Sequence, residues 1–255
     1  MNLYYELLKR PVFTIEDAQE YYNNISSART AVKRLLDQRM VSKIRRNLYT
    51  CISGETGAPV ANRFQIASSL TKTSYVTHHT AMEFYGITDQ VFYEVYVSSE
   101  TEFKSFSFDG YTYRFIKPKI SDGVEEVKFS GGVRVTDKER TILDSIKDMD
   151  RISGVEEVIS NVGAMNRIKE KKLIQYLKKY DNQFLYQKTG YILFHMKLRY
   201  KLSKTFFLLC KEKAGKSSRY LTSDCKAGKF DAEWNLVVPD GLFQTKNGGL
   251  IDADV

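Results

Sequence analysis

A change of hydrophobic period within residues 26–51 constrains the fold of this chain more than any other feature. In the first half of this segment the apolar residues recur every three or four positions, which is the period of one helix face, and basic residues occupy the opposite face. After Met40 the period falls to two, on either side of the dipeptide Arg45–Arg46. The apolar positions of the first half are Ala28, Val32, Leu35 and Leu36. We therefore predict a helix with Ser26 or Ser27 as its N-cap, followed by a hairpin of two short strands.

Two further helices are predicted before this segment. The first runs to Leu8 and is ended by Pro11, which cannot continue a helix. The second begins at Thr14, and acidic residues in its first turn complement the helix dipole. Asn23–Asn24 then provides a turn. Three helices followed by a hairpin are the element order of a winged helix-turn-helix DNA-binding module.

Basic residues dominate this predicted module. Residues 26–50 carry seven Lys or Arg residues against one acid, Asp37. Phosphate neutralisation supplies most DNA affinity and base-edge contacts supply specificity, so both parts of the segment are candidate contacts. On the third helix the candidates are Ser27, Arg29, Thr30, Lys33 and Arg34, and on the wing they are Lys43, Arg45, Arg46, Asn47 and Tyr49. A module that has lost DNA binding and only contacts other proteins is the alternative, but it has no need of this charge excess.

The remainder of the chain mixes helices and strands. Residues 53–59 have the Gly, Ser and Pro content of a linker, so we predict a DNA-binding domain over 1–52 and a larger domain over 60–255. Asp109–Gly110 indicates a tight hairpin turn. The predicted helices span 60–70, 77–85, 168–180, 185–198 and 203–213, and a further helix begins at 136–139. The predicted strands span 91–98, 103–108, 111–116, 124–129, 133–135, 220–222 and 234–238. The fold class is therefore α+β: a winged helix-turn-helix domain plus a mixed α/β domain whose distal part is helical.

A second basic region covers residues 164–216, with fourteen Lys or Arg residues against three acids. Within a predicted amphipathic helix, Lys171, Lys172, Lys178 and Lys179 recur at a spacing of seven and share the outer face. Such a face is compatible with RNA, DNA or an acidic protein partner, and equally with simple solvation.

Signals of catalysis are weak. His79 and Glu83 stand four residues apart on a predicted helix, but no third metal ligand is near them in sequence. Asp231, Glu233 and Asp240 with Lys246 resemble a nuclease cluster loosely, so a metal-dependent DNA nuclease targeted by a winged helix remains an alternative. The sequence contains no P-loop, dinucleotide fingerprint or nucleophile elbow. We expect no enzyme activity, no catalytic residues, no metal and no cofactor.

Cysteine usage and hydropathy bear on the compartment. The three cysteines are widely separated and form no ligand or disulfide pattern. No secretory signal and no apolar run near eighteen residues is visible. We expect a cytoplasmic protein that makes no membrane contact.

The order of several segments is similar to that of a known family. These segments are Arg45–Tyr49, Tyr75–Gln90, Tyr113–Ile116, Val133–Ser145, Gly154–Val158 and Thr189–Leu193. Together they resemble the AbiEi antitoxins of bacterial abortive-infection systems, a family of transcriptional regulators. Asn47 replaces the usual wing glycine of that family, and Asn tolerates a left-handed backbone better than most residues. The tail beyond about residue 217 has no counterpart in the resemblance.

The resemblance implies a double role. Such proteins repress their own operon by binding inverted repeats of double-stranded DNA through the N-terminal winged helix. They also counteract a toxin of nucleotidyltransferase type, and the C-terminal domain is needed for that. The implied partners are thus an inverted-repeat operator and either the toxin or its RNA target. A regulator that acts through protein contact alone is the remaining alternative.

Overall fold

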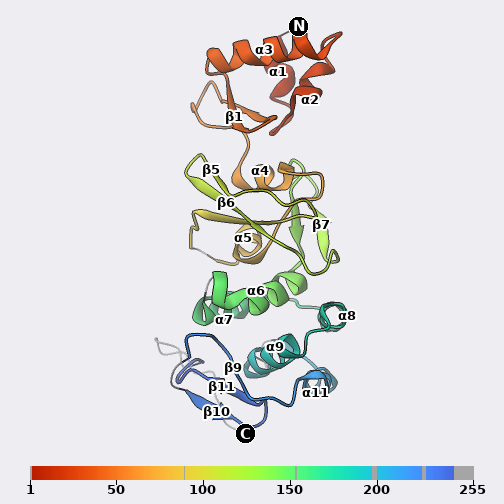
Figure 1. The fold of residues 1–255 in the computed structure, drawn as a ribbon, viewed down its shortest axis with the longest axis vertical. Coiled ribbons are helices and arrows are strands. Elements are labelled where there is room, and N and C mark those ends of the chain that lie inside the picture. Colours follow the sequence, from red (N-terminus) through yellow and green to blue (C-terminus); the bar gives the residue numbers. More distant parts are fainter. Residues whose placement is uncertain (1, 89, 153, 197–199, 226–227, 244–255) are drawn as a thin grey trace. The chain divides into compact units, whose positions relative to one another are not determined.

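The computed structural model describes residues 2–88, 90–152, 154–196, 200–225 and 228–243. Helices and sheets are both present, which confirms the predicted α+β class (Figure 1). The chain divides into two compact units, residues 1–137 and 138–255. Within the described ranges no helix is both long and apolar enough to cross a membrane.

Three helices and a two-stranded antiparallel sheet form the first part of the first unit, in the predicted order. They are α1 (Leu3–Leu7), α2 (Ile15–Gln19), α3 (Ile25–Asp37), β1 (Val41–Arg45) and β2 (Leu48–Cys51). Thr14 caps α2 as predicted, and its hydroxyl accepts a hydrogen bond from the Asp17 backbone N–H. The helices and the hairpin bury one apolar cluster, whose members include Leu7, Ala28 and Val41.

The predicted N-cap of α3 is wrong. Asn24 caps the helix instead of Ser26 or Ser27, and its Oδ1 accepts the backbone N–H of Ser27 at 2.9 Å. Asn is as good an N-cap as Ser, and starting the helix two or three residues earlier than predicted lets Ile25 pack against the apolar cluster.

A six-stranded mixed sheet forms the rest of the first unit, in the order β5-β6-β4-β3-β8-β7. Figure 1 shows α4 and α5 on opposite faces of this sheet. The predicted Asp109–Gly110 turn is confirmed, because both residues have positive φ angles, of 49° and 79°. The elements are α4 (Arg63–Ser69), β3 (Tyr75–Val76), α5 (His78–Phe84), β4 (Glu94–Ser98), β5 (Phe106–Phe108), β6 (Tyr111–Ile116), β7 (Val124–Glu126) and β8 (Arg134–Thr136).

The hairpin also contributes to the apolar cluster of this sheet. Ile44 of β1 and Leu48 of β2 are buried in one cluster with Ile66 of α4 and Val97 of β4. The predicted boundary at residues 53–59 stays a prediction.

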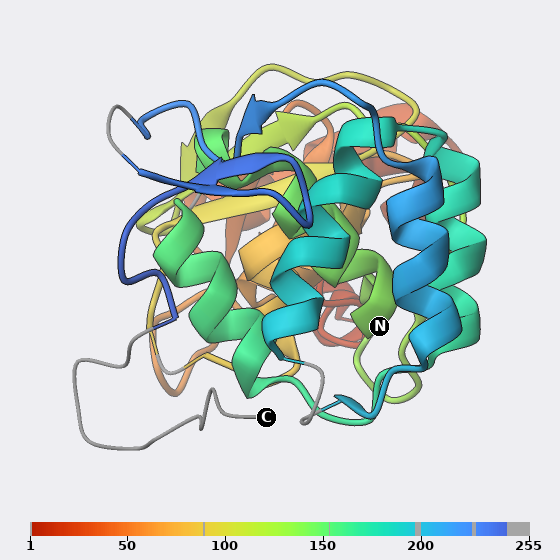
Figure 2. The same ribbon diagram turned by 90° about the horizontal axis from the view of Figure 1, so that it is seen from below.

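Helices dominate the second unit, as predicted for the distal part, and Figure 2 shows α9 running beside α11. Its elements are α6 (Lys138–Ile152), α7 (Val155–Ala164), α8 (Glu170–Tyr180), α9 (Gln183–His195), α11 (Lys204–Lys213), β9 (Arg219–Tyr220), β10 (Lys229–Asp231) and β11 (Leu236–Val238). The predicted helix 185–198 begins two residues earlier, because Asn182 caps it, and residues 197–198 lie outside the described ranges. The three strands form a sheet of order β10-β11-β9, of which β10 was not predicted.

Charged side chains are buried inside the second unit. The sequence pattern of α6 does not indicate this burial. Arg140 and Asp144 are buried and form an ion pair at 2.9 Å. The Tyr180 hydroxyl of α8 donates to the same carboxylate. Buried charges are tolerated when paired and hydrogen-bonded, as these are.

Candidate nucleic-acid interface

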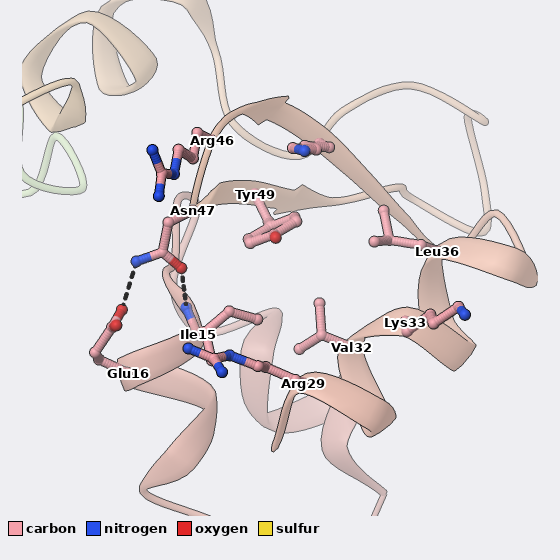
Figure 3. A pocket seen from close by; sticks show the side chains of 10 residues that line it. Ile15, Glu16, Arg29, Val32, Lys33, Leu36, Arg46, Asn47 and Tyr49 are labelled. Carbon is pink, nitrogen blue, oxygen red and sulfur yellow. Dashed lines mark hydrogen bonds between the residues drawn. The ribbon is translucent and has the colours of Figure 1, made fainter. Parts of the chain in front are cut away.

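A hollow of about 450 Å³ opens between α3 and the β1–β2 hairpin (Figure 3). The start of α2 closes one side of it. Its lining residues are Ile15, Glu16, Arg29, Val32, Lys33, Leu36, Lys43, Arg46, Asn47 and Tyr49. Six of the ten predicted DNA contacts are among them, and they come from both the helix and the hairpin.

The floor of the hollow is apolar. Val32 and Leu36 stand one helical turn apart on α3, and Ile15 and Tyr49 face them from α2 and β2 (Figure 3). Val32 is 1% exposed because its other side packs into the apolar cluster of the first three helices. A close-packed floor holds the surrounding polar side chains in fixed positions.

Four cationic side chains surround this floor. Arg29 and Lys33 project from α3 at a spacing of four, and so they share one face of the helix. Lys43 and Arg46 come from the hairpin. All four are exposed. Cations gathered in a concave surface raise the local positive potential, and such a surface attracts polyanions.

Asn47 fastens the hairpin turn to the start of α2. Its backbone has a φ of 55°, so the predicted left-handed conformation is confirmed. Its Oδ1 accepts the backbone N–H of Ile15 at 3.1 Å, and its Nδ2 donates to Oε2 of Glu16 at 2.7 Å (Figure 3). The hydrogen bond from Asn47, with a smaller contribution from the positive charge of Arg29, lowers the pKa of Glu16. Glu16 therefore lies in the hollow as a carboxylate anion at neutral pH.

Arg45 lies away from the hollow although it was predicted to belong to the same site. The strand register shifts between Lys43 and Arg45, and such a bulge turns the following side chain away from the regular alternation. The Arg45 guanidinium lies over the rings of Phe103 and Phe106, at 5.7 and 5.6 Å from their centroids. Its aromatic neighbours are distant in sequence, so no local pattern could indicate this contact.

The other predicted contacts on α3 also lie outside the hollow. Thr30 is exposed, and its hydroxyl donates to the backbone carbonyl of Ser26 at 3.0 Å. Ser27 and Arg34 are exposed on the same helix.

Sequence reasoning missed Ile15, Glu16, Val32 and Leu36 as members of the site. Glu16 was interpreted only as a complement of the helix dipole, Val32 and Leu36 were interpreted only as core, and Ile15 was assigned no role. The signal that could have found Glu16 was its position in the first turn of the helix preceding the basic one.

The second basic face lies on α8. Lys171, Lys178 and Lys179 are exposed there, and Lys172 is half-buried. The predicted position on the outer face of the helix is confirmed for Lys171, Lys178 and Lys179.

The His79–Glu83 pair is not arranged as a pair of metal ligands. Glu83 forms an ion pair with Arg63 at 3.1 Å, and burial raises the pKa of the Glu83 carboxyl. His79 is buried, its ring stacks on Phe92 with a centroid distance of 4.0 Å, and its Nε2 lies 3.1 Å from the Glu94 carbonyl oxygen. Within the part of the chain that the structure describes, no three His, Cys, Asp or Glu side chains gather to hold a metal ion.

The carboxylates of the nuclease alternative have local partners. Asp231 accepts the backbone N–H of Trp234 at 2.9 Å, and Glu233 pairs with Lys211. Asp240 is exposed, and Lys246 lies outside the described residues.

Comparison with known proteins bears on the fold. No family model matches the sequence, and a search of curated proteins finds no match. The structure is similar to the crystal structure of the RV2827C protein from Mycobacterium tuberculosis, with a TM-score of 0.63 over 93% of this chain and 90% of that one. Sequence identity is only 11%, so this similarity shows a shared fold and nothing further.

Proposed function

We propose that this protein is a sequence-specific double-stranded DNA-binding regulator that represses its own operon. The observation that carries the proposal is the hollow between α3 and the hairpin, around which Arg29, Lys33, Lys43 and Arg46 are gathered. A helix and a hairpin that present cations to one concave surface suit a duplex, whose groove admits a helix while its backbone passes a wing.

The four cations divide into two roles. Arg29 and Lys33 lie on the exposed face of α3, where a helix inserted in the major groove presents side chains to base edges. Arg can donate two hydrogen bonds to guanine, which gives sequence discrimination. Lys43 and Arg46 on the hairpin neutralise phosphates, which adds affinity without sequence preference.

The family resemblance supports a second role in this proposal, that of an AbiE-type antitoxin against a nucleotidyltransferase-type toxin. The exposed lysines of α8 are then the surface for the toxin or for its RNA target. Co-expression with a nucleotidyltransferase encoded beside this protein tests the role, because rescue of growth should be lost when Lys171, Lys178 and Lys179 are all changed to Ala. Rescue that is retained in full would remove α8 from the proposal.

Footprinting on the DNA upstream of the protein's own reading frame tests the repressor role. We expect protected inverted repeats, weakened by Arg29→Ala and by Lys33→Ala. Lys9→Ala is the matched control, because it removes a positive charge from the turn that follows α1, outside the hollow. Loss of Lys43 or Arg46 should lower the slope of log affinity against log salt by roughly 0.9 for each phosphate contact removed. Equal binding to any duplex would contradict a specific repressor, and no binding would contradict DNA recognition altogether.

A further inference from the structure

Glu16 is the one acidic side chain among the described residues that line the hollow. Its position is unexpected for a surface that binds phosphates, because a carboxylate repels them. We propose that Glu16 is a specificity-determining residue, which weakens binding of the DNA backbone alone and leaves binding dependent on base contacts. The inference rests on the proposed DNA-binding function and identifies how the same hollow discriminates among duplexes.

The geometry keeps this carboxylate in the hollow. Nδ2 of Asn47 donates to Glu16 at 2.7 Å, while Oδ1 of the same amide accepts the Ile15 backbone N–H at 3.1 Å (Figure 3). Because the amide is held at both ends, Glu16 cannot swing away without breaking a fixed contact. The negative charge is therefore a permanent part of the surface that DNA meets.

Charge explains why the effect is selective. Arg29 lies close enough to lower the pKa of Glu16, so the two side chains partly neutralise each other. A phosphate near Arg29 meets this fixed anion and is bound less strongly. A base edge carries no net charge, and the amino group of cytosine can donate to a carboxylate. Glu16 thus weakens contacts to phosphates, which every DNA sequence presents, and permits contacts to base edges, which differ from one DNA sequence to another.

The substitution Glu16→Gln separates this role from a purely structural one. A Gln side-chain oxygen can still accept the hydrogen bond from Asn47, so the hairpin stays fastened to α2 while the negative charge is lost. Asp37→Asn is the matched control, since it removes one negative charge from the exposed end of α3, outside the hollow.

The experiment compares two duplexes, the protein's own upstream repeat and a random sequence of equal length. Fluorescence anisotropy would follow their binding to the full chain at several salt concentrations, and thermal unfolding would verify the fold of each variant. We expect Glu16→Gln to bind the random duplex about threefold to tenfold more tightly at low salt, with a smaller gain on the repeat, so that the ratio of the two affinities falls. Asp37→Asn should change both affinities less than about twofold and leave their ratio unaltered.

Two outcomes would overturn the inference, and they differ in whether the proposed function also fails. If the wild-type chain binds the repeat in preference to the random duplex but Glu16→Gln leaves the ratio unchanged, the role of Glu16 is wrong while the proposed function stands. If the wild-type chain binds neither duplex, the proposed function fails and the inference fails with it.

Discussion

Phe13 and Tyr49 exchange both of their backbone hydrogen bonds, each 2.9 Å long, and their rings stack with a centroid distance of 5.7 Å. This bridge joins the segment between α1 and α2 to the second strand of the hairpin. The hairpin is therefore fixed to the helices at two places, here and at Asn47, and the shape of the hollow depends on both.

The Phe13 ring should be one of the largest single contributions to the stability of the first unit. It is 1% exposed, so Phe13→Ala removes a fully buried ring and should lower the free energy of unfolding by about 3–5 kcal/mol. Urea denaturation followed by circular dichroism measures this change. Tyr5→Ala on α1 is the control, because Tyr5 is 64% exposed and its loss should cost no more than about 0.5 kcal/mol. Equal costs for both variants would contradict the assignment of Phe13 to the core.

Two substitutions of the turn residue Asn47 should separate the contribution of its backbone conformation to stability from that of its side-chain hydrogen bonds. Asn47→Gly removes both hydrogen bonds of the amide but accepts the φ of 55° without strain. Asn47→Ala loses the same bonds and adds about 1 kcal/mol of left-handed strain. Thermal or urea denaturation should therefore rank wild type above the Gly variant and the Gly variant above the Ala variant. An Ala variant as stable as the Gly variant would show that the turn relaxes to another conformation.

Gly190 of α9 allows a close approach of the Trp234 ring in the second unit. A Cβ atom at residue 190 would lie 2.1 Å from Cζ3 of Trp234 and 2.9 Å from Cβ of Cys210. Gly190→Ala should therefore destabilise the chain by about 1–3 kcal/mol through overpacking. Urea denaturation followed by the fluorescence of Trp234, the chain's one tryptophan, reports on this position directly.

The control for this variant is Gly163→Ala near the end of α7. Among the described residues, a Cβ atom there would meet only Cε of Met196, at 3.9 Å, which is an ordinary contact. Because Ala favours the helix over Gly, this variant should be neutral or more stable by up to about 1 kcal/mol. A similar loss for both variants would show that the close approach of the Trp234 ring is not the reason why Gly190→Ala destabilises the chain.

His79 should make the stability of the first unit depend on pH. Burial lowers its pKa from 6.5 to about 4. Between these values the unfolded chain binds a proton that the folded chain excludes, so the contribution of His79 is complete above about pH 6.5 and is lost progressively as the pH falls toward 4. The pKa difference corresponds to about 3 kcal/mol over this range.

Urea denaturation at intervals between pH 4 and pH 7.5 measures this effect. His79→Gln retains a side-chain N–H for the Glu94 carbonyl oxygen but cannot titrate, so its free energy of unfolding should fall less steeply below pH 6.5. Parallel pH profiles for the two proteins would show that His79 takes up its proton equally well when folded.

The positions of the helices and turns could largely be predicted from local sequence, because their causes lie within a few residues. Thr14 caps α2 through the backbone of Asp17, three positions away. Asp109–Gly110 adopts the positive φ angles that a two-residue hairpin turn requires. The apolar period of Ala28 and Val32 fixes which face of α3 is buried and which face carries the cations.

Which polar residues share one surface depends on contacts made in the folded chain. The bulge after Lys43 sends Arg45 to two aromatic rings some sixty residues away in sequence, and the Asn47 amide brings Glu16 into a group of cations. The helix, the hairpin and their charge can therefore be predicted from the amino-acid sequence, since they follow from periodicity and short-range hydrogen bonds. The membership of the hollow depended on contacts between distant segments, and no local pattern encodes those contacts.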